Sequence, residues 1–97
     1  MSERIERIKN AVEKQQGCRV KHIESLRVQE KWIDEIAWDG VVETLDLLNH
    51  PTAKRVYAWE RWEPGEERRY TIVLSVPPVN SARAAVKAAI MAVVKKL

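Results

Sequence analysis

The sequence predicts an α+β two-layer sandwich, in which two helices cover one face of a four-stranded antiparallel sheet. Apolar residues recur with a helical period near both ends of the chain and with a period of two between them. Turn-forming residues separate the alternating segments, so consecutive strands are expected to be antiparallel, in the order α-β-β-β-β-α. The chain has 97 residues, of which 45% are hydrophobic and 32% charged. This length and composition indicate a single globular domain over residues 1–97.

The first segment predicts a helix over residues 3–16. Ile5, Ile8 and Val12 follow helical spacing and form one narrow apolar stripe. Ser2 is a suitable N-cap, and Gly17 can adopt the left-handed conformation that ends a helix.

Two strands are expected next. An alternating segment over residues 20–32 places four apolar side chains on one parity: Val20, Leu26, Val28 and Trp32. Residues 33–35 are predicted as the turn, and a second strand runs over residues 36–47. Its alternation changes at Gly40, which predicts a β-bulge at Asp39–Gly40.

A second pair of strands follows the loop at residues 49–52. These strands are expected over residues 55–62 and 69–76, joined by a type II turn at residues 63–66, where Pro precedes Gly. Pro77 and Pro78 end the last strand.

The last segment predicts a helix over residues 82–97, capped by Asn80 or Ser81. Its apolar line packs on the sheet. The predicted core comprises Ile5, Ile8, Val12, Val20, Val28, Ile72, Leu74, Val86, Ile90 and Val93.

Catalytic and metal-binding patterns are absent from the sequence. Cys18, His22 and His50 show no metal-ligand spacing, and no nucleophile elbow or glycine-rich phosphate loop occurs. Cys18 is expected as a small buried residue and His50 as a turn cap. We therefore expect no metal, no cofactor and no catalytic residue, and an enzyme is the less favoured class.

Carboxylates are frequent in the middle of the chain and are interpreted as a solvated surface. They fall mostly on turns or on the polar parity of strands: Glu30, Asp34, Glu35, Asp39, Glu43 and Asp46.

The aromatic residues predict a binding surface. The chain has 4 Trp and 2 Tyr but no Phe, and all six rings lie between residues 32 and 70. If both helices cover one face, some rings remain on the open face and form an interface. The leading hypothesis is a non-catalytic interaction module, a homodimer or a binder of a protein partner, that uses this face or an edge strand. The interface candidates are Tyr57, Trp59, Trp38 and Trp62. A small-ligand pocket between helices and sheet is left open.

The charge distribution supports an alternative, nucleic-acid (RNA) binding. Residues 51–97 carry 9 basic and 4 acidic side chains, a net charge of +5, whereas residues 18–50 carry 4 and 7, a net charge of −3. Glutamates beside the same arginines would offset part of this field. The candidate contacts are Lys54, Arg55, Arg61, Arg68, Arg69, Arg83 and Lys87.

The compartment is expected to be the cytoplasm. The single cysteine favours a reducing environment, the charged N-terminus lacks a signal-peptide pattern, and no apolar run is long enough to span a membrane.

Two resemblances accompany these patterns. Residues 81–89 resemble the final helix of double-stranded-RNA-binding domains, and the resemblance implies phosphate contacts by Arg83 and Lys87. The segments W-x-G-x-V-E at residues 38–43, N-H-P-x-A at 49–53, Y-A-W at 57–59 and P-P-V-x-S at 77–81 are similar to small bacterial proteins of unassigned function. Those proteins carry glycine at the position of Asn49. This second resemblance implies a bacterial, cytoplasmic domain and no particular activity.

Overall fold

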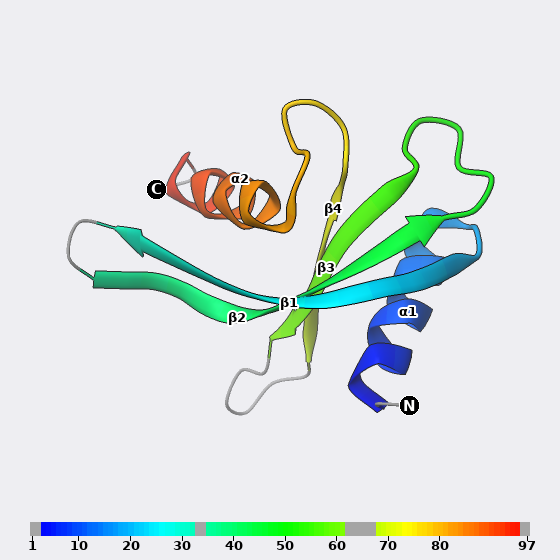
Figure 1. Cartoon of the computed structure of the whole chain (residues 1–97), viewed down its shortest axis with the longest axis horizontal. Coiled ribbons are helices and arrows are strands. Elements are labelled where there is room, and N and C mark those ends of the chain that lie inside the picture. The colour runs from blue at the N-terminus through cyan, green and yellow to red at the C-terminus, as the bar shows by residue number, and fades with distance from the viewer. Residues whose placement is uncertain (1–2, 33–34, 62–67, 96–97) are drawn as a thin grey trace.

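The computed structural model describes residues 3–32, 35–61 and 68–95 and confirms the predicted fold class and element order (Figure 1). A four-stranded antiparallel sheet in the order β1-β2-β3-β4 lies between an N-terminal and a C-terminal helix. The elements are α1 (Glu3–Gln16), β1 (Val20–Trp32), β2 (Glu35–Leu47), β3 (Arg55–Arg61), β4 (Arg69–Leu74) and α2 (Ala82–Lys95).

Local signals set the ends of both helices. Gly17 adopts a φ of 66°, and its N–H donates to the carbonyl of Glu13, which ends α1 as predicted. Ser81 caps α2, because its hydroxyl accepts a hydrogen bond of 3.1 Å from the N–H of Ala84. The predicted Ser2 cap and the turn at residues 63–66 lie outside the described residues, as do residues 33 and 34 of the first turn.

The predicted bulge at Asp39–Gly40 is wrong. Gly40 pairs regularly with Val28, and the β1–β2 register shifts elsewhere, between His22 and Glu24 and between Glu30 and Lys31. Gly40 has a different role: a Cβ atom there would lie 3.0 Å from the ring of Trp38. The glycine therefore makes room for the indole.

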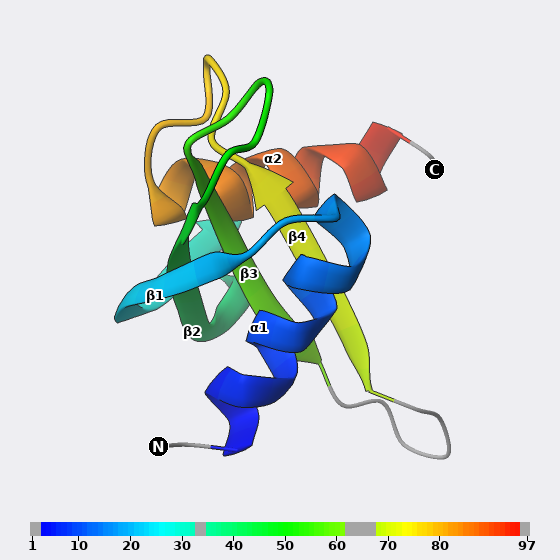
Figure 2. The same cartoon turned by 90° about the vertical axis from the view of Figure 1, so that its right-hand side faces the viewer.

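The predicted placement of both helices on one face is also corrected, because the helices lie on opposite faces of the sheet (Figure 2). On β3, Val56 and Ala58 pack in the cluster that contains α1, whereas Tyr57 and Trp59 pack in the cluster that contains α2. Alternate side chains of a strand point to opposite faces. The central strands are therefore buried on both sides, and the molecule has three layers.

Most of the predicted core is found in these two clusters. Five predicted residues are buried: Ile8, Val12, Val20, Val28 and Val86. Ile72, Leu74 and Ile90 are partly buried against the clusters, Ile5 is half-buried, and the side chain of Val93 lies outside the description. The prediction missed the interior of β2 and β3, where Val42, Leu45, Val56 and Ala58 are fully buried.

The loop between β2 and β3 is shaped by two residues. Asn49 has a φ of 62°, a conformation that asparagine and glycine tolerate best. His50 accepts hydrogen bonds at Nδ1 from the N–H groups of Thr52 and Ala53, at 3.2 and 3.0 Å, and its Nε2 lies 3.0 Å from Oε1 of Gln16. His50 caps the turn, as predicted.

Candidate functional site

The ladder between β2 and β3 is short, and the two strands diverge beyond it. It joins four residue pairs, from Asp46–Arg55 to Glu43–Ala58, although β2 starts at Glu35 and β3 continues to Arg61. Figure 1 shows β2 running away from β3 beyond this point. We call the gap lined by residues 38–41 of β2 and 59–61 of β3 the β2–β3 cleft.

The hydrogen bonds of β2 show which backbone groups face this cleft. The N–H of Leu47 donates to Lys54 on the β3 side, and the N–H of Leu48 donates to Arg19 on the β1 side. Backbone groups of successive strand residues point to alternate sides. The N–H and C=O groups of Val41 and Asp39 therefore point toward the cleft, where the described residues provide no β3 ladder partner.

Two adjoining pockets lie where β2 and β3 diverge. One, of about 220 Å³, is lined by the cleft residues 38–41 and 59–61. The other, of about 290 Å³, is lined by Arg4, Val41, Glu60 and Arg68. Val41 and Glu60 belong to both, so the pockets meet at the diverging strands. We call the second one the Arg4 pocket.

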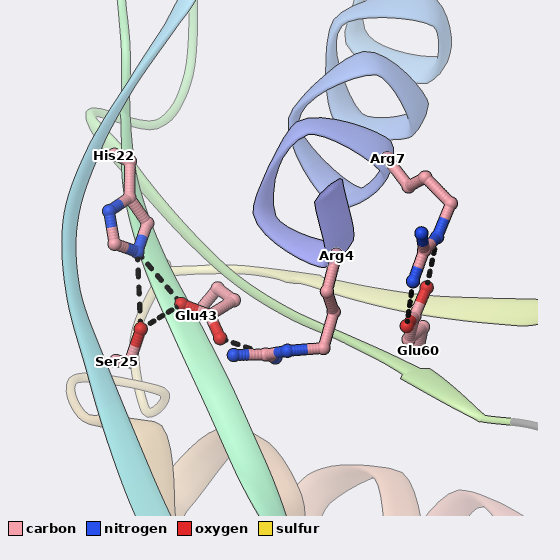
Figure 3. A network of polar contacts seen from close by, with 6 residues as sticks. All are labelled: Arg4, Arg7, His22, Ser25, Glu43 and Glu60. Carbon is pink, nitrogen blue, oxygen red and sulfur yellow. Dashed lines mark hydrogen bonds and ion pairs between the residues drawn. The ribbon is translucent and has the colours of Figure 1, made fainter. Parts of the chain in front are cut away.

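A buried carboxylate, that of Glu43, pairs with Arg4 of this pocket (Figure 3). Glu43 is 0% exposed, and its Oε1 accepts hydrogen bonds from His22 Nε2, at 2.7 Å, and from the hydroxyl of Ser25. Its Oε2 forms an ion pair with the Arg4 guanidinium at 2.5 Å. A buried charge is costly unless it is paired, and this one is stabilised by the ion pair with Arg4 and by two hydrogen bonds from β1, although its Oε2 accepts no hydrogen bond within the described residues.

A second ion pair, between Arg7 and Glu60, lies on the same face of the sheet. Arg7 donates two hydrogen bonds to Glu60, of 3.2 and 2.8 Å. These bonds, and the positive charges of Arg7, Arg68 and Arg4, hold the pKa of Glu60 below its usual range. The first two turns of α1 thus fix one carboxylate on β2 and one on β3, where the strands separate.

The structure brings together two of the predicted interface residues. Trp38 and Trp59 line the cleft, with ring centroids 5.3 Å apart in an edge-to-face arrangement. Tyr57 and Trp59 are only 4% and 5% exposed because α2 covers them, so these rings do not form an open aromatic face. Trp62 lies outside the described residues.

The nucleic-acid candidates are distributed over separate parts of the molecule. Arg61 and Arg69 are cross-strand neighbours, with Arg68 next to them. Two others are ion-paired: Arg55 with Asp46 at 2.9 Å, and Arg83 with Glu30 at 2.9 Å. Lys54 lies in the β2–β3 loop, and Lys87 is exposed on α2.

Sequence reasoning missed the polar network and assigned Glu43 to a solvated surface. A signal was present: Glu43 shares its parity with Val41, Leu45 and Leu47, so a single carboxylate interrupts an apolar row. Its partners come from distant parts of the chain: Arg4 could not be assigned without the packing of α1, nor His22 and Ser25 without the register between β1 and β2.

The other features considered in the sequence are a single cysteine, possible metal ligands and possible membrane spans. Cys18 is a half-buried free thiol that packs against the α1 cluster. Within residues 3–32, 35–61 and 68–95, no cluster of His, Cys, Asp or Glu could hold a metal ion. In the same ranges neither helix is long and apolar enough to cross a membrane.

Comparison of the chain with models of protein families, with curated proteins and with solved structures finds no match. The resemblances to double-stranded-RNA-binding domains and to small bacterial proteins stay predictions.

Proposed function

We propose that this chain is a small, non-catalytic interaction module that binds an extended segment of a partner protein in the β2–β3 cleft. The end of the β2–β3 ladder at Glu43 carries the proposal, because both strands continue beyond it. An exposed strand edge binds an extended peptide by adding it as a further strand, through hydrogen bonds to the backbone. Val41 and Asp39 direct such groups toward the gap.

The outer edge of β1 is less suited to this role. The register shift after His22 interrupts it, and Arg83 donates a hydrogen bond of 3.2 Å to the carbonyl of Gln29. Bulges and covering side chains are common protections of edge strands against unwanted pairing. The cleft edge of β2 contains no such bulge between Asp39 and Leu47.

The cleft also offers apolar contact area. Trp38, which is half-buried, lines it on the side of α2, and Val41 is 38% exposed, whereas Trp59 is buried and packs against the Trp38 ring. Aromatic residues are enriched at protein interfaces, where a ring combines a large apolar area with few lost rotamers. These contacts add to the backbone hydrogen bonds of the bound segment.

The polar network does not support nucleophilic catalysis. Ser25 lies 3.5 Å from Nε2 of His22, and the same nitrogen contacts Glu43. A catalytic triad needs the carboxylate and the serine on opposite ring nitrogens, so that the histidine can accept the serine proton. The network instead fits a role in positioning Arg4. A cytoplasmic location belongs to the proposal and is supported by the single free thiol of Cys18.

The test is selection of random displayed peptides on the immobilised protein, followed by affinity measurement with two variants. Val41→Pro removes the cleft-facing N–H, whereas Val41→Ala keeps it, so the difference between them reports the backbone contribution. We expect selected peptides to bind Val41→Ala measurably and Val41→Pro not at all, with both variants folded by circular dichroism. Failure to select peptides, or equal binding to both variants, would overturn the proposal.

Self-association is tested by sedimentation at micromolar concentration. A dimer that Val41→Pro dissociates would identify a second copy of this chain as the source of the segment. A dimer that survives in Val41→Pro would place self-association outside the cleft.

Nucleic-acid binding is the alternative, supported by the neighbouring cations Arg61, Arg68 and Arg69. It predicts binding to a random oligonucleotide that weakens steeply with salt, by about one unit of logarithmic slope per neutralised phosphate. The double change Arg68→Ala and Arg69→Ala should weaken that binding further. No binding at low salt eliminates the alternative.

A further inference from the structure

We infer that the segment bound in the β2–β3 cleft carries an acidic side chain that enters the Arg4 pocket and pairs with Arg4. This inference rests on the proposed function and adds the chemistry of the partner.

The Arg4 guanidinium is positioned in advance of binding. Its side chain is 33% exposed, yet it is anchored at 2.5 Å to a carboxylate that is fully buried. Glu43 is itself fixed by His22 and Ser25 on β1. A guanidinium carries several N–H donors, so one edge can bind Glu43 while another binds a ligand carboxylate. Such support from neighbouring groups reduces the ordering cost of binding.

The carboxylates near the pocket are already engaged. Glu60 lines the pocket but accepts two hydrogen bonds from Arg7, and Glu43 has no exposed surface. Among the described residues of the lining, Arg4 and Arg68 are the other charged ones. Because Glu43 and Glu60 have cationic partners, as does Asp39 of the cleft lining through Arg27, an incoming carboxylate gains more from Arg4 than it loses by repulsion.

The geometry of an added strand also places an apolar side chain next to the acidic one. Side chains of the bound segment alternate between the two faces of the sheet. Those on the α1 side lie beside Val41 and the Arg4 pocket, and those on the α2 side lie beside Trp38 and Trp59. The preferred segment therefore carries an Asp or Glu at one position and apolar residues at the positions directly flanking it.

The test uses the displayed random peptides selected on the wild-type protein. We expect an Asp or Glu at one aligned position with apolar residues on both sides. Binding of these peptides should fall about tenfold or more in the double variant Arg4→Met and Glu43→Met, which loses the guanidinium without leaving a buried charge unpaired. Arg19→Gln removes an exposed arginine outside both pockets, tests for unspecific charge attraction and should bind as the wild type does.

The outcomes separate this inference from the proposed function. Peptides that require the Val41 N–H but show no acidic position, or that bind the double variant as well as the wild type, overturn the inference and leave the cleft proposal in place. Absence of any peptide sensitive to Val41→Pro overturns both. Acidic peptides that lose binding equally in Arg19→Gln indicate unspecific charge attraction and overturn the inference.

Discussion

Beneath α1 the sheet buries a carboxylate, whereas beneath α2 it buries aromatic rings. Glu43 is held by Arg4 and His22 on the first face, and Trp59 packs with Trp38 on the second. Glu43 and Trp59 are both buried, but their chemistry differs. An apolar ring under a helix is explained by packing alone, and a buried charge is not. The α1 face therefore holds the feature that packing does not explain, a buried charge paired with an arginine of an open pocket.

The largest effect is expected on the α2 face. Trp59→Ala removes a nearly buried ring from the cluster of Val28, Val42 and Val86 and should lower the free energy of unfolding by about 3–5 kcal/mol. Trp59→Phe fills most of the space and should cost much less. Urea denaturation measures both. A small loss for Trp59→Ala would show that α2 does not pack on this ring.

A smaller loss of stability is expected on the α1 face, and a second substitution should recover it. Arg4→Met leaves Glu43 buried with His22 and Ser25 only, and should cost about 2–3 kcal/mol. The double variant Arg4→Met and Glu43→Met should recover most of this loss, because the unpaired charge is gone. If the double variant is as unstable as Arg4→Met, the network is needed for folding rather than for presenting Arg4.

The contact between Gly40 and the Trp38 ring, on the α2 face, is tested by Gly40→Ala. The new Cβ would lie 3.0 Å from the Trp38 ring, which is the far end of a side chain that can move. We expect a loss below about 1 kcal/mol, with a clear change in the near-ultraviolet circular dichroism of the Trp38–Trp59 pair. An unchanged spectrum would mean that Trp38 does not cover Gly40.

The smallest effect on stability is expected at Glu60, and it depends on pH. Its pKa is lowered in the folded protein by the hydrogen bonds from Arg7, so the Arg7 contact stabilises the fold above the ordinary glutamate pKa of 4.5. This contribution is lost as the pH falls through the lowered pKa. Glu60→Gln should therefore be less stable than the wild type at neutral pH and equal to it in strong acid. A stability difference that persists at low pH would contradict this cause.

The sequence predicted the elements better than their packing. Gly17 and Ser81 mark helix ends through local backbone chemistry, so the ends of the helices could be found without tertiary information. The sequence could not show, however, which faces of the sheet are covered. Val56 and Tyr57 both belong to the core because β3 is covered on both sides, and an alternation pattern cannot distinguish two buried faces from one.

The candidate site was predicted only in part. Trp38 and Trp59 were expected at an interface, and they line the cleft, although α2 covers much of Trp59. Val41 and Arg4 were not expected, because the end of a ladder depends on how far two strands diverge. No pattern of residues in the sequence indicates where two paired strands diverge.

Amide hydrogen exchange along β2 tests most directly whether the β2–β3 cleft presents an unpaired strand edge. The N–H of Val42 points toward β1, and that of Leu45 toward its ladder partner Val56, so both should exchange slowly. The N–H of Val41, one residue from Val42, should exchange rapidly in the free protein and slow down when a selected peptide is added. Slow exchange at Val41 in the free protein, equal to that of Val42, would contradict the account.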